Sequence, residues 1–158
     1  MSLKVYVIYG QGGKGPLSAG FILFRNRLTG LGYDVVDSFL WKHPDAIIED
    51  IHNLPKKTKV ALLGYSMGAN CTTWVASAGQ KIDLICAYDP SVWSYVNPIE
   101  KNVKRTICYS QNYDLFGRVK LEGYNVENII TAIPHIGISY AENLHKISLE
   151  ALSEIEGE

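Results

Sequence analysis

One serine in this chain stands in a setting that suits nucleophilic chemistry. Ser66 is the central residue of the pentapeptide Gly-Tyr-Ser-Met-Gly at 64–68, which directly follows an apolar run at 59–63. Small residues continue at 69–76, a stretch typical of a helix. The pattern G-x-S-x-G between a strand and a helix holds the serine on a sharp, strained turn with its hydroxyl exposed. Glycines flank it because strand and helix pass too close for side chains. The sequence therefore predicts Ser66 as a nucleophile.

A serine hydroxyl is a weak nucleophile and needs a base to take its proton. His135 follows a predicted strand at 126–133 and precedes a helical segment. In a parallel sheet, reactive residues gather beyond the carboxyl ends of the strands, so His135 can meet Ser66 there. Without Ser66, the sequence would favour His135 as a helix-capping or surface residue; with Ser66, its position and the chain order favour the catalytic interpretation. The other histidines, at a helix start, a helix end and inside the last helix, are His43, His52 and His145.

Two aspartates can orient the base. Asp114 lies in the loop at 111–117 after the fifth predicted strand, and the sequence favours it, although an aspartate before a glycine is also ordinary turn chemistry. Asp89 ends the fourth predicted strand, in Tyr-Asp-Pro, and is the alternative. Either carboxylate would accept a hydrogen bond from the imidazole and stabilise its charged form.

Backbone N–H groups must hold the developing oxyanion. Met67, directly after the serine, should supply one, and Gln11, in the glycine-rich loop at 10–13, the second. This loop does not fit the spacing of phosphate-binding motifs, because Lys14 precedes its glycine and a proline follows. The residues that we expect to line a substrate pocket are Gly12, Tyr65, Asp89 and Trp93.

Strands and helices alternate along the chain. Strands are predicted at 4–9, 33–37, 59–63, 82–88, 105–110 and 126–133, and helices at 17–31, 43–51, 69–79 and 138–155. The strands are nearly continuous apolar runs, which is typical of a parallel sheet covered on both faces. The fold class expected is α/β, a three-layer sandwich with a mainly parallel sheet of about six strands.

Composition limits the function classes. The length of 158 residues favours one domain, 1–158, and 47% apolar with 20% charged residues is ordinary for a globular protein. A formal net charge of −1 and the lack of a dense Lys/Arg cluster argue against nucleic-acid binding. No apolar stretch is long enough for a membrane span, and the first residues do not resemble a signal peptide. The three cysteines, without metal-ligand spacing, suggest buried thiols, no metal site and a cytoplasmic location.

Together these motifs resemble those of serine hydrolases with the α/β-hydrolase fold, in a short form without a cap domain. The resemblance covers nearly the whole chain, from Tyr9-Gly10 through the pentapeptide at 64–68 to Asp114 and His135. It implies a Ser66–His135–Asp114 triad, an acyl-enzyme intermediate, a small-molecule ester or thioester substrate and no cofactor. Two departures concern substrate preference: Tyr9 stands where His is usual, and Pro134 where a glycine often precedes the histidine.

The same residues are compatible with other functions. A hydrolase fold can serve as a catalytically inactive binding protein, because fold does not dictate function. An alcohol could replace water in the second step, which would make the chain an acyltransferase. A nucleotide-binding, flavodoxin-like domain is the weakest alternative, because its phosphate loop would be the poorly matching loop at 10–15. The sequence does not indicate an oligomeric state.

Overall fold

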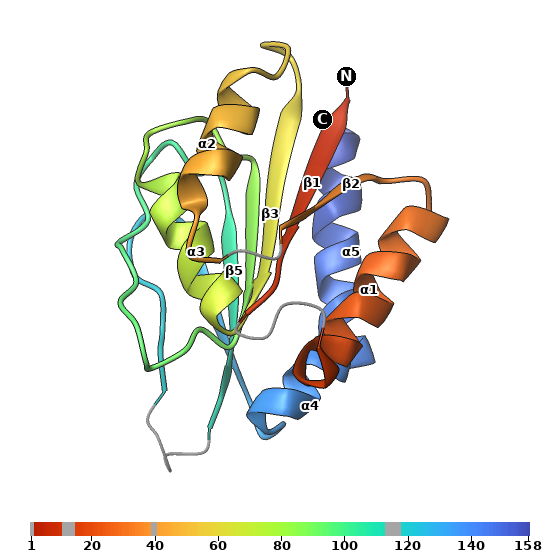
Figure 1. Ribbon diagram of the computed structural model, residues 1–158, viewed down its shortest axis with the longest axis vertical. Helices are drawn as coiled ribbons and strands as arrows, with labels where there is room; N and C mark the ends of the chain where they lie inside the picture. The colour runs from red at the N-terminus through yellow and green to blue at the C-terminus, as the bar shows by residue number, and fades with distance from the viewer. Residues whose placement is uncertain (1, 11–14, 39–40, 113–117) are drawn as a thin grey trace.

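A single sheet of six parallel strands forms the centre of the molecule, in the order β2-β1-β3-β4-β5-β6 (Figure 1). The computed structural model describes residues 2–10, 15–38, 41–112 and 118–158. The strands are β1 (Leu3–Ile8), β2 (Asp34–Ser38), β3 (Lys59–Tyr65), β4 (Leu84–Tyr88), β5 (Thr106–Gln111) and β6 (Val126–Thr131). The expected α/β class and parallel sheet are confirmed.

Burial follows the position of each strand in the sheet. Every residue of the central strands β3 and β4 is buried, whereas the edge strands β2 and β6 are only partly buried. Asn128 interrupts the apolar pattern of β6, and its side-chain amide exchanges two hydrogen bonds with the backbone of Leu121 (3.0 and 2.8 Å). That polar residue therefore ties a neighbouring loop to the edge of the sheet.

Helices cover both faces of the sheet (Figure 1). One face carries α1 (Ala19–Gly30), preceded by the short helix η1 (Pro16–Ser18), together with α4 (His135–Tyr140) and α5 (Glu142–Glu156). The other carries α2 (Pro44–His52) and α3 (Met67–Ala76). Two apolar layers result, one built around Phe21, Phe24 and Tyr88 and the other around Leu62 and Ile85.

The C-terminal helical region differs from the expectation of one helix at 138–155. The helix begins at His135 and is divided by Ala141, whose backbone is extended (ψ 103°). The two pieces cover different partners, because α4 packs against α1 and α5 against β3 and β4. Alanine is a good helix former, so the sequence carries no local stop signal at 141. The division places His135 in the first turn of a separate short helix.

Candidate active site

Ser66 occupies the turn between β3 and α3. Its backbone has φ 57° and ψ −123°, a region that residues other than glycine rarely adopt, as the sequence predicted. A Cβ on Gly64 would lie 2.3 Å from the carbonyl oxygen of Gly68, and one on Gly68 only 2.1 Å from that of Ile8. Both glycines are thus required by the close approach of backbone segments, which supports the strained turn.

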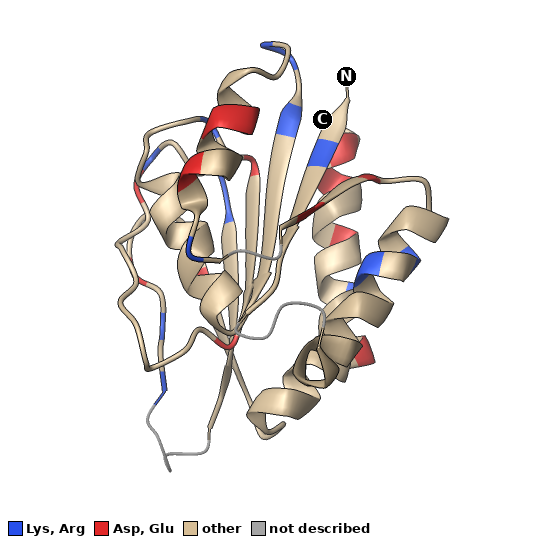
Figure 2. Ribbon diagram, in the orientation of Figure 1, with Lys and Arg blue, Asp and Glu red and all other residues tan. Residues whose placement is uncertain are grey.

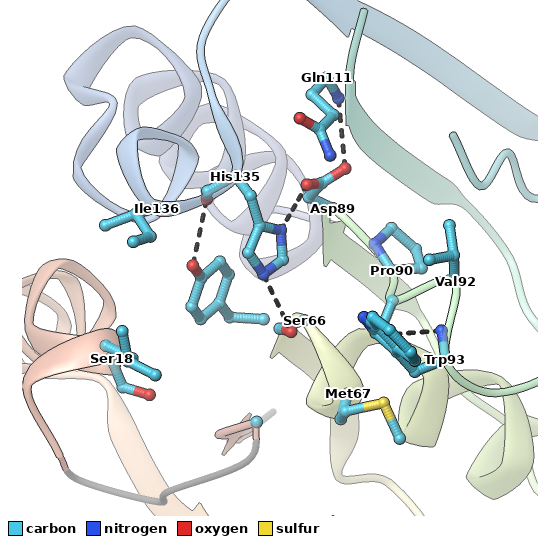
Figure 3. Close-up of a pocket in the computed structure, with 14 residues that line it drawn as sticks. Ser18, Ser66, Met67, Asp89, Pro90, Val92, Trp93, Gln111, His135 and Ile136 are labelled. Carbon is cyan, nitrogen blue, oxygen red and sulfur yellow. Dashed lines mark hydrogen bonds and ion pairs between the residues drawn. The ribbon is translucent and has the colours of Figure 1, made fainter. Parts of the chain in front are cut away.

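His135 bridges Ser66 and a carboxylate (Figure 3). Its Nε2 lies 3.1 Å from the Ser66 Oγ, and its Nδ1 lies 2.5 Å from Oδ2 of Asp89. The imidazole is 38% exposed and the Asp89 side chain 3%. A carboxylate accepts only, so Nδ1 carries the proton in this pair and Nε2 is left to accept the serine proton. The arrangement can move a proton between Ser66 and the imidazole.

Asp89 directly follows β4 and is fixed by the backbone around it. Its φ is 49°, its N–H donates to the carbonyl of Tyr109 (2.7 Å), and its Oδ1 accepts the N–H of Gln111 (3.2 Å). The sequence favoured Asp114 for this position and kept Asp89 as the alternative. Asp114 lies outside the described residues, and the carboxylate in contact with His135 is that of Asp89.

Strand order explains why Asp89 lies at this position. Because β4 pairs directly with β3, the first residue after β4 lies next to the turn that carries Ser66, and the N–H of Ser66 donates to the carbonyl of Tyr88 (2.9 Å). The strand β5, which precedes Asp114, is one position farther away in the sheet. The sequence indicated Asp89 only through its position directly after the fourth strand, because the sequence alone does not say which strands are neighbours.

Tyr65 contacts His135 through both its hydroxyl and its ring. Its hydroxyl donates to the carbonyl oxygen of His135 (3.1 Å), and its ring stacks on the imidazole with centroids 5.2 Å apart. Burial, together with the nearby Asp89 charge, raises the pKa of Tyr65 to about 12, so the hydroxyl keeps its proton. The sequence suggested Tyr65 as a pocket residue; it lines the cavity and also fixes the position of His135.

Met67 is the first residue of α3. The N–H groups of the first helical turn have no partner within the helix, and the helix dipole makes this end attractive to negative charge. Gly10, two residues after β1, passes close by: a Cβ there would lie 3.1 Å from Cβ of Ser66 and 3.3 Å from the Met67 nitrogen. Gln11 and Gly12, expected to contribute to this site, lie outside the described residues.

A cavity of about 430 Å³ opens over Ser66. One wall comes from η1 and α4, with Leu17, Ser18 and Ile136, and the other from α3 and the segment after β4. Figure 3 shows the members of that second wall on the far side of Ser66 from Ile136. They are Met67, Pro90, Val92 and Trp93.

The wall after β4 is held by a buried amide. The Asn70 Nδ2 donates to the carbonyl oxygens of Ser91 (2.9 Å), Ser94 (3.2 Å) and Tyr95 (3.2 Å), and its Oδ1 accepts the N–H of Ser91 (2.7 Å). Asn70 is completely buried in α3. One side chain therefore satisfies several backbone groups and fixes the segment that carries Trp93.

Comparisons with proteins of known sequence found no matching family model and no matching curated relative. Solved structures do match. An esterase from Pyrococcus furiosus superposes with a TM-score of 0.70 at 16% identity, covering 97% of this chain and 82% of that one. Est1E from Butyrivibrio proteoclasticus gives 0.61 at 10% identity, covering 96% and 89%. A protein from Xanthomonas campestris, assigned to the alpha/beta superfamily of hydrolases, gives 0.60 at 10% identity, covering 95% and 99%.

The chain has an α/β-hydrolase fold. In this hydrolase fold the sheet edge with Ser66 and His135 is also the edge where the cavity opens. The three cysteines are buried and unpaired, as expected, and burial raises the pKa of Cys71 and Cys86 to about 12 and that of Cys108 to about 11. None of them lines the cavity. Their thiols therefore stay protonated, and a protonated thiol is a poor nucleophile.

The described part of the hydrolase fold holds no group of three or more His, Cys, Asp or Glu side chains arranged to bind a metal ion. Within the same residues, every helix is too short or too polar to cross a bilayer.

Proposed function

We propose that this protein is a serine hydrolase that cleaves carboxylic ester or thioester bonds, with Ser66 as nucleophile, His135 as general base and acid, and Asp89 as the orienting carboxylate. One observation carries the proposal: a single imidazole contacts the serine oxygen at 3.1 Å and a buried carboxylate at 2.5 Å. Those are hydrogen-bonding distances for a nucleophile, a base and its orienting group. The hydrolases and esterases with the same fold support this class of chemistry.

In the first half of the reaction, the Ser66 Oγ attacks the acyl carbonyl carbon and His135 Nε2 takes the hydroxyl proton. A bond forms between Oγ and carbon, and the carbonyl electron pair moves onto oxygen. The tetrahedral intermediate then collapses: the bond to the leaving oxygen or sulfur breaks, and that atom takes the proton from Nε2. The product is an acyl-enzyme on Ser66.

In the second half, water attacks the acyl carbon and gives a proton to Nε2. Collapse of the second tetrahedral intermediate breaks the bond between Oγ and carbon, and Oγ takes its proton back from Nε2. The carboxylic acid leaves and the enzyme is restored. Asp89 does not change protonation; its charge stabilises the imidazolium that forms in both halves.

The oxyanion is held by backbone N–H groups. Met67 donates from the first turn of α3, where an N–H faces the developing charge without a partner in the helix. The second donor is the N–H of Gln11, as the sequence predicts. Its neighbour Gly10 supports this assignment, because it lies against Ser66 and the Met67 nitrogen.

The test is hydrolysis of p-nitrophenyl butyrate by wild type and by Ser66→Ala. The variant should lose turnover by a factor on the order of 10⁴ or more while its circular dichroism spectrum stays unchanged. Ser77→Ala, at the opposite end of α3, is the matched control and should keep wild-type activity. A folded Ser66→Ala protein with wild-type turnover would rule out this mechanism. A folded wild type that hydrolyses no ester would favour an inactive binding protein.

A further inference from the structure

The cavity over Ser66 has almost no free charge among the residues that the structure describes. Neither lysine nor arginine lines its described walls, and the ionisable groups there are Asp89, His135 and the neutral Tyr65. Asp89 and His135 are already bonded to each other at 2.5 Å. A carboxylate or phosphate on the substrate would therefore lose its water shell in this cavity without gaining a cation from these walls.

The same cavity has an apolar rim. Leu17 is 59% exposed, Ile136 51%, Val92 41% and Trp93 80%, and all four line the cavity. Large exposed apolar side chains gathered around one opening indicate a binding surface rather than ordinary surface composition. An apolar group seated there would remove these side chains from water, which is the main favourable term in such binding.

The geometry of the reaction assigns different substrate groups to the two walls of the cavity. The leaving atom must lie within reach of the His135 Nε2, and Ile136 is the next residue along the chain. The oxyanion points to the Met67 N–H in the first turn of α3. The acyl chain, the remaining substituent of the tetrahedral carbon, is then directed to the side of Ser66 opposite Ile136, where Figure 3 places Pro90, Val92 and Trp93.

Trp93 is the largest side chain of that opposite wall. The backbone N–H of Trp93 donates to the Oγ of Ser91 (3.1 Å), and the backbone of Ser91 is itself bound by the buried amide of Asn70. The backbone that carries the indole is thus fixed, and the exposed side chain lines the cavity. This is the arrangement expected of a side chain that selects a substrate group by its length and polarity.

We propose that the cavity selects uncharged, apolar acyl groups and that Trp93 is the residue that sets this preference. The inference rests on the proposed hydrolase function and adds its substrate class. Acyl chains of several carbons should be accepted along Met67, Val92 and Trp93, whereas acyl groups that end in a carboxylate should be rejected.

The experiment keeps the leaving group constant and varies the acyl group. For p-nitrophenyl acetate, butyrate and hexanoate, kcat/KM should rise by roughly threefold to fourfold for each buried methylene. p-Nitrophenyl hemisuccinate and its neutral methyl ester have nearly the same shape and differ in charge. The hemisuccinate should be the poorer substrate by about tenfold or more, because its carboxylate finds no cation in the described walls.

Trp93→Ala should flatten the rise from acetate to hexanoate, because kcat/KM should fall more for hexanoate than for acetate when the indole is removed. Tyr95→Ala is the matched control: Tyr95 is 64% exposed and lies two residues away, but its ring packs on Trp74 and does not line the cavity. It should keep the wild-type slope.

The outcomes separate the two proposals. If wild type hydrolyses these esters with no chain-length preference, or prefers the hemisuccinate, the acyl-selectivity proposal is wrong and the hydrolase function stands. The role of Trp93 is also wrong if Trp93→Ala keeps the full slope. If folded wild type hydrolyses none of the esters, the hydrolase function itself fails, and the proposal that rests on it fails as well.

Discussion

Two aspartates bracket β4, Asp83 directly before it and Asp89 directly after it, and both are almost inaccessible to solvent (4% and 2% exposed). Asp83 accepts the N–H of Val60 (2.9 Å) and so joins the start of β4 to β3. Asp89 accepts the N–H of Gln111 and also contacts His135 beside a cavity. Equal burial of the same residue type therefore has two uses: one carboxylate stabilises the sheet, and the other positions a titratable group.

The two ends of the sheet show the same contrast, between groups that stabilise the fold and groups that form the candidate site. The amino end carries a cleft with five lysines, whose charges are partly satisfied within the fold: Lys59 donates to the Ile155 carbonyl (2.5 Å), and Lys104 pairs with Glu158. The carboxyl end carries the strained backbones of Ser66 and Asp89 and a mostly uncharged cavity. Figure 2 shows basic segments at the start of β1 and β3 and mostly uncharged ribbon around the opposite edge. Strain and open space thus coincide at the proposed active site.

Within the comparison of the two aspartates, the largest expected effect is that of Asp89→Asn on catalysis. An amide cannot stabilise the imidazolium and favours the wrong tautomer of His135, so kcat/KM should fall by about 10³-fold to 10⁴-fold. Asp114→Asn is the control from the competing prediction and should stay within about threefold of wild type. The measurement is steady-state hydrolysis of p-nitrophenyl butyrate. The reverse pattern, a large loss in Asp114→Asn alone, would transfer the acid role to Asp114.

Asp83→Ala should have the opposite effect: it should lower the stability of the fold and leave the activity unchanged. The buried N–H of Val60 would lose its partner, at a cost of about 1–3 kcal/mol in the free energy of unfolding. Activity per folded molecule should be unchanged, because Asp83 lies at the far end of β4 from Ser66. Urea unfolding and turnover at low temperature measure the two quantities separately. A selective loss of turnover in a fully folded Asp83→Ala protein would remove the contrast between the two aspartates.

Tyr65→Phe should give a smaller effect confined to the site. The ring that stacks on His135 remains, but the hydroxyl that holds the His135 carbonyl is lost. We expect kcat to fall by about threefold to tenfold with KM nearly unchanged, since the substitution alters the placement of the base rather than a contact with substrate. Comparison of kcat and KM with wild type makes the test. A change in KM alone would mean that Tyr65 acts on the substrate and does not position the base.

The smallest effect concerns a second histidine. His145 is buried, stacks on Phe24 at 4.2 Å between ring centroids, and faces the Ser139 carbonyl at 2.8 Å. Burial lowers the pKa of His145 below its usual value of 6.5. As the pH falls, the imidazole of the unfolded chain takes up a proton before the buried imidazole of the folded chain does. The stability that depends on a neutral His145 is therefore fully present above about pH 6.5 and is lost as the pH falls below that value.

Urea unfolding at pH 7.5 and 5.5 should therefore show lower stability at the acidic pH, and the loss should be smaller in His145→Gln. If acidification instead stabilised the wild type relative to His145→Gln, the result would show that the His145 ring is charged inside the fold.

The parts of this fold that were predictable from the sequence are those fixed by local pattern. The turn at Ser66 was predictable because its flanking glycines mark a place where backbone segments pass too close for a side chain. The parallel sheet was predictable because short apolar strands alternate with helices along the chain. The position of His135 after the last strand is also local, and the structure brings it to 3.1 Å from Ser66.

What the sequence did not settle depends on neighbours in space. Asp89 and Asp114 each follow a predicted strand, and only the pairing of β3 with β4 puts Asp89 beside the imidazole. The break at Ala141 arises because α4 and α5 pack on different elements, which no periodicity along the chain records. Gln11 as an oxyanion donor stays a prediction, because it lies outside the described residues.

The central claim is that His135 activates Ser66. Reaction with a fluorophosphonate, followed by digestion and mass spectrometry of the peptides, tests it most directly. The expected result is one phosphonate per chain, on the peptide that contains Ser66, with labelling slowed by at least about 10³-fold in a folded His135→Gln protein. No adduct on Ser66 in the folded protein, or equally fast labelling of the His135 variant, would contradict the account.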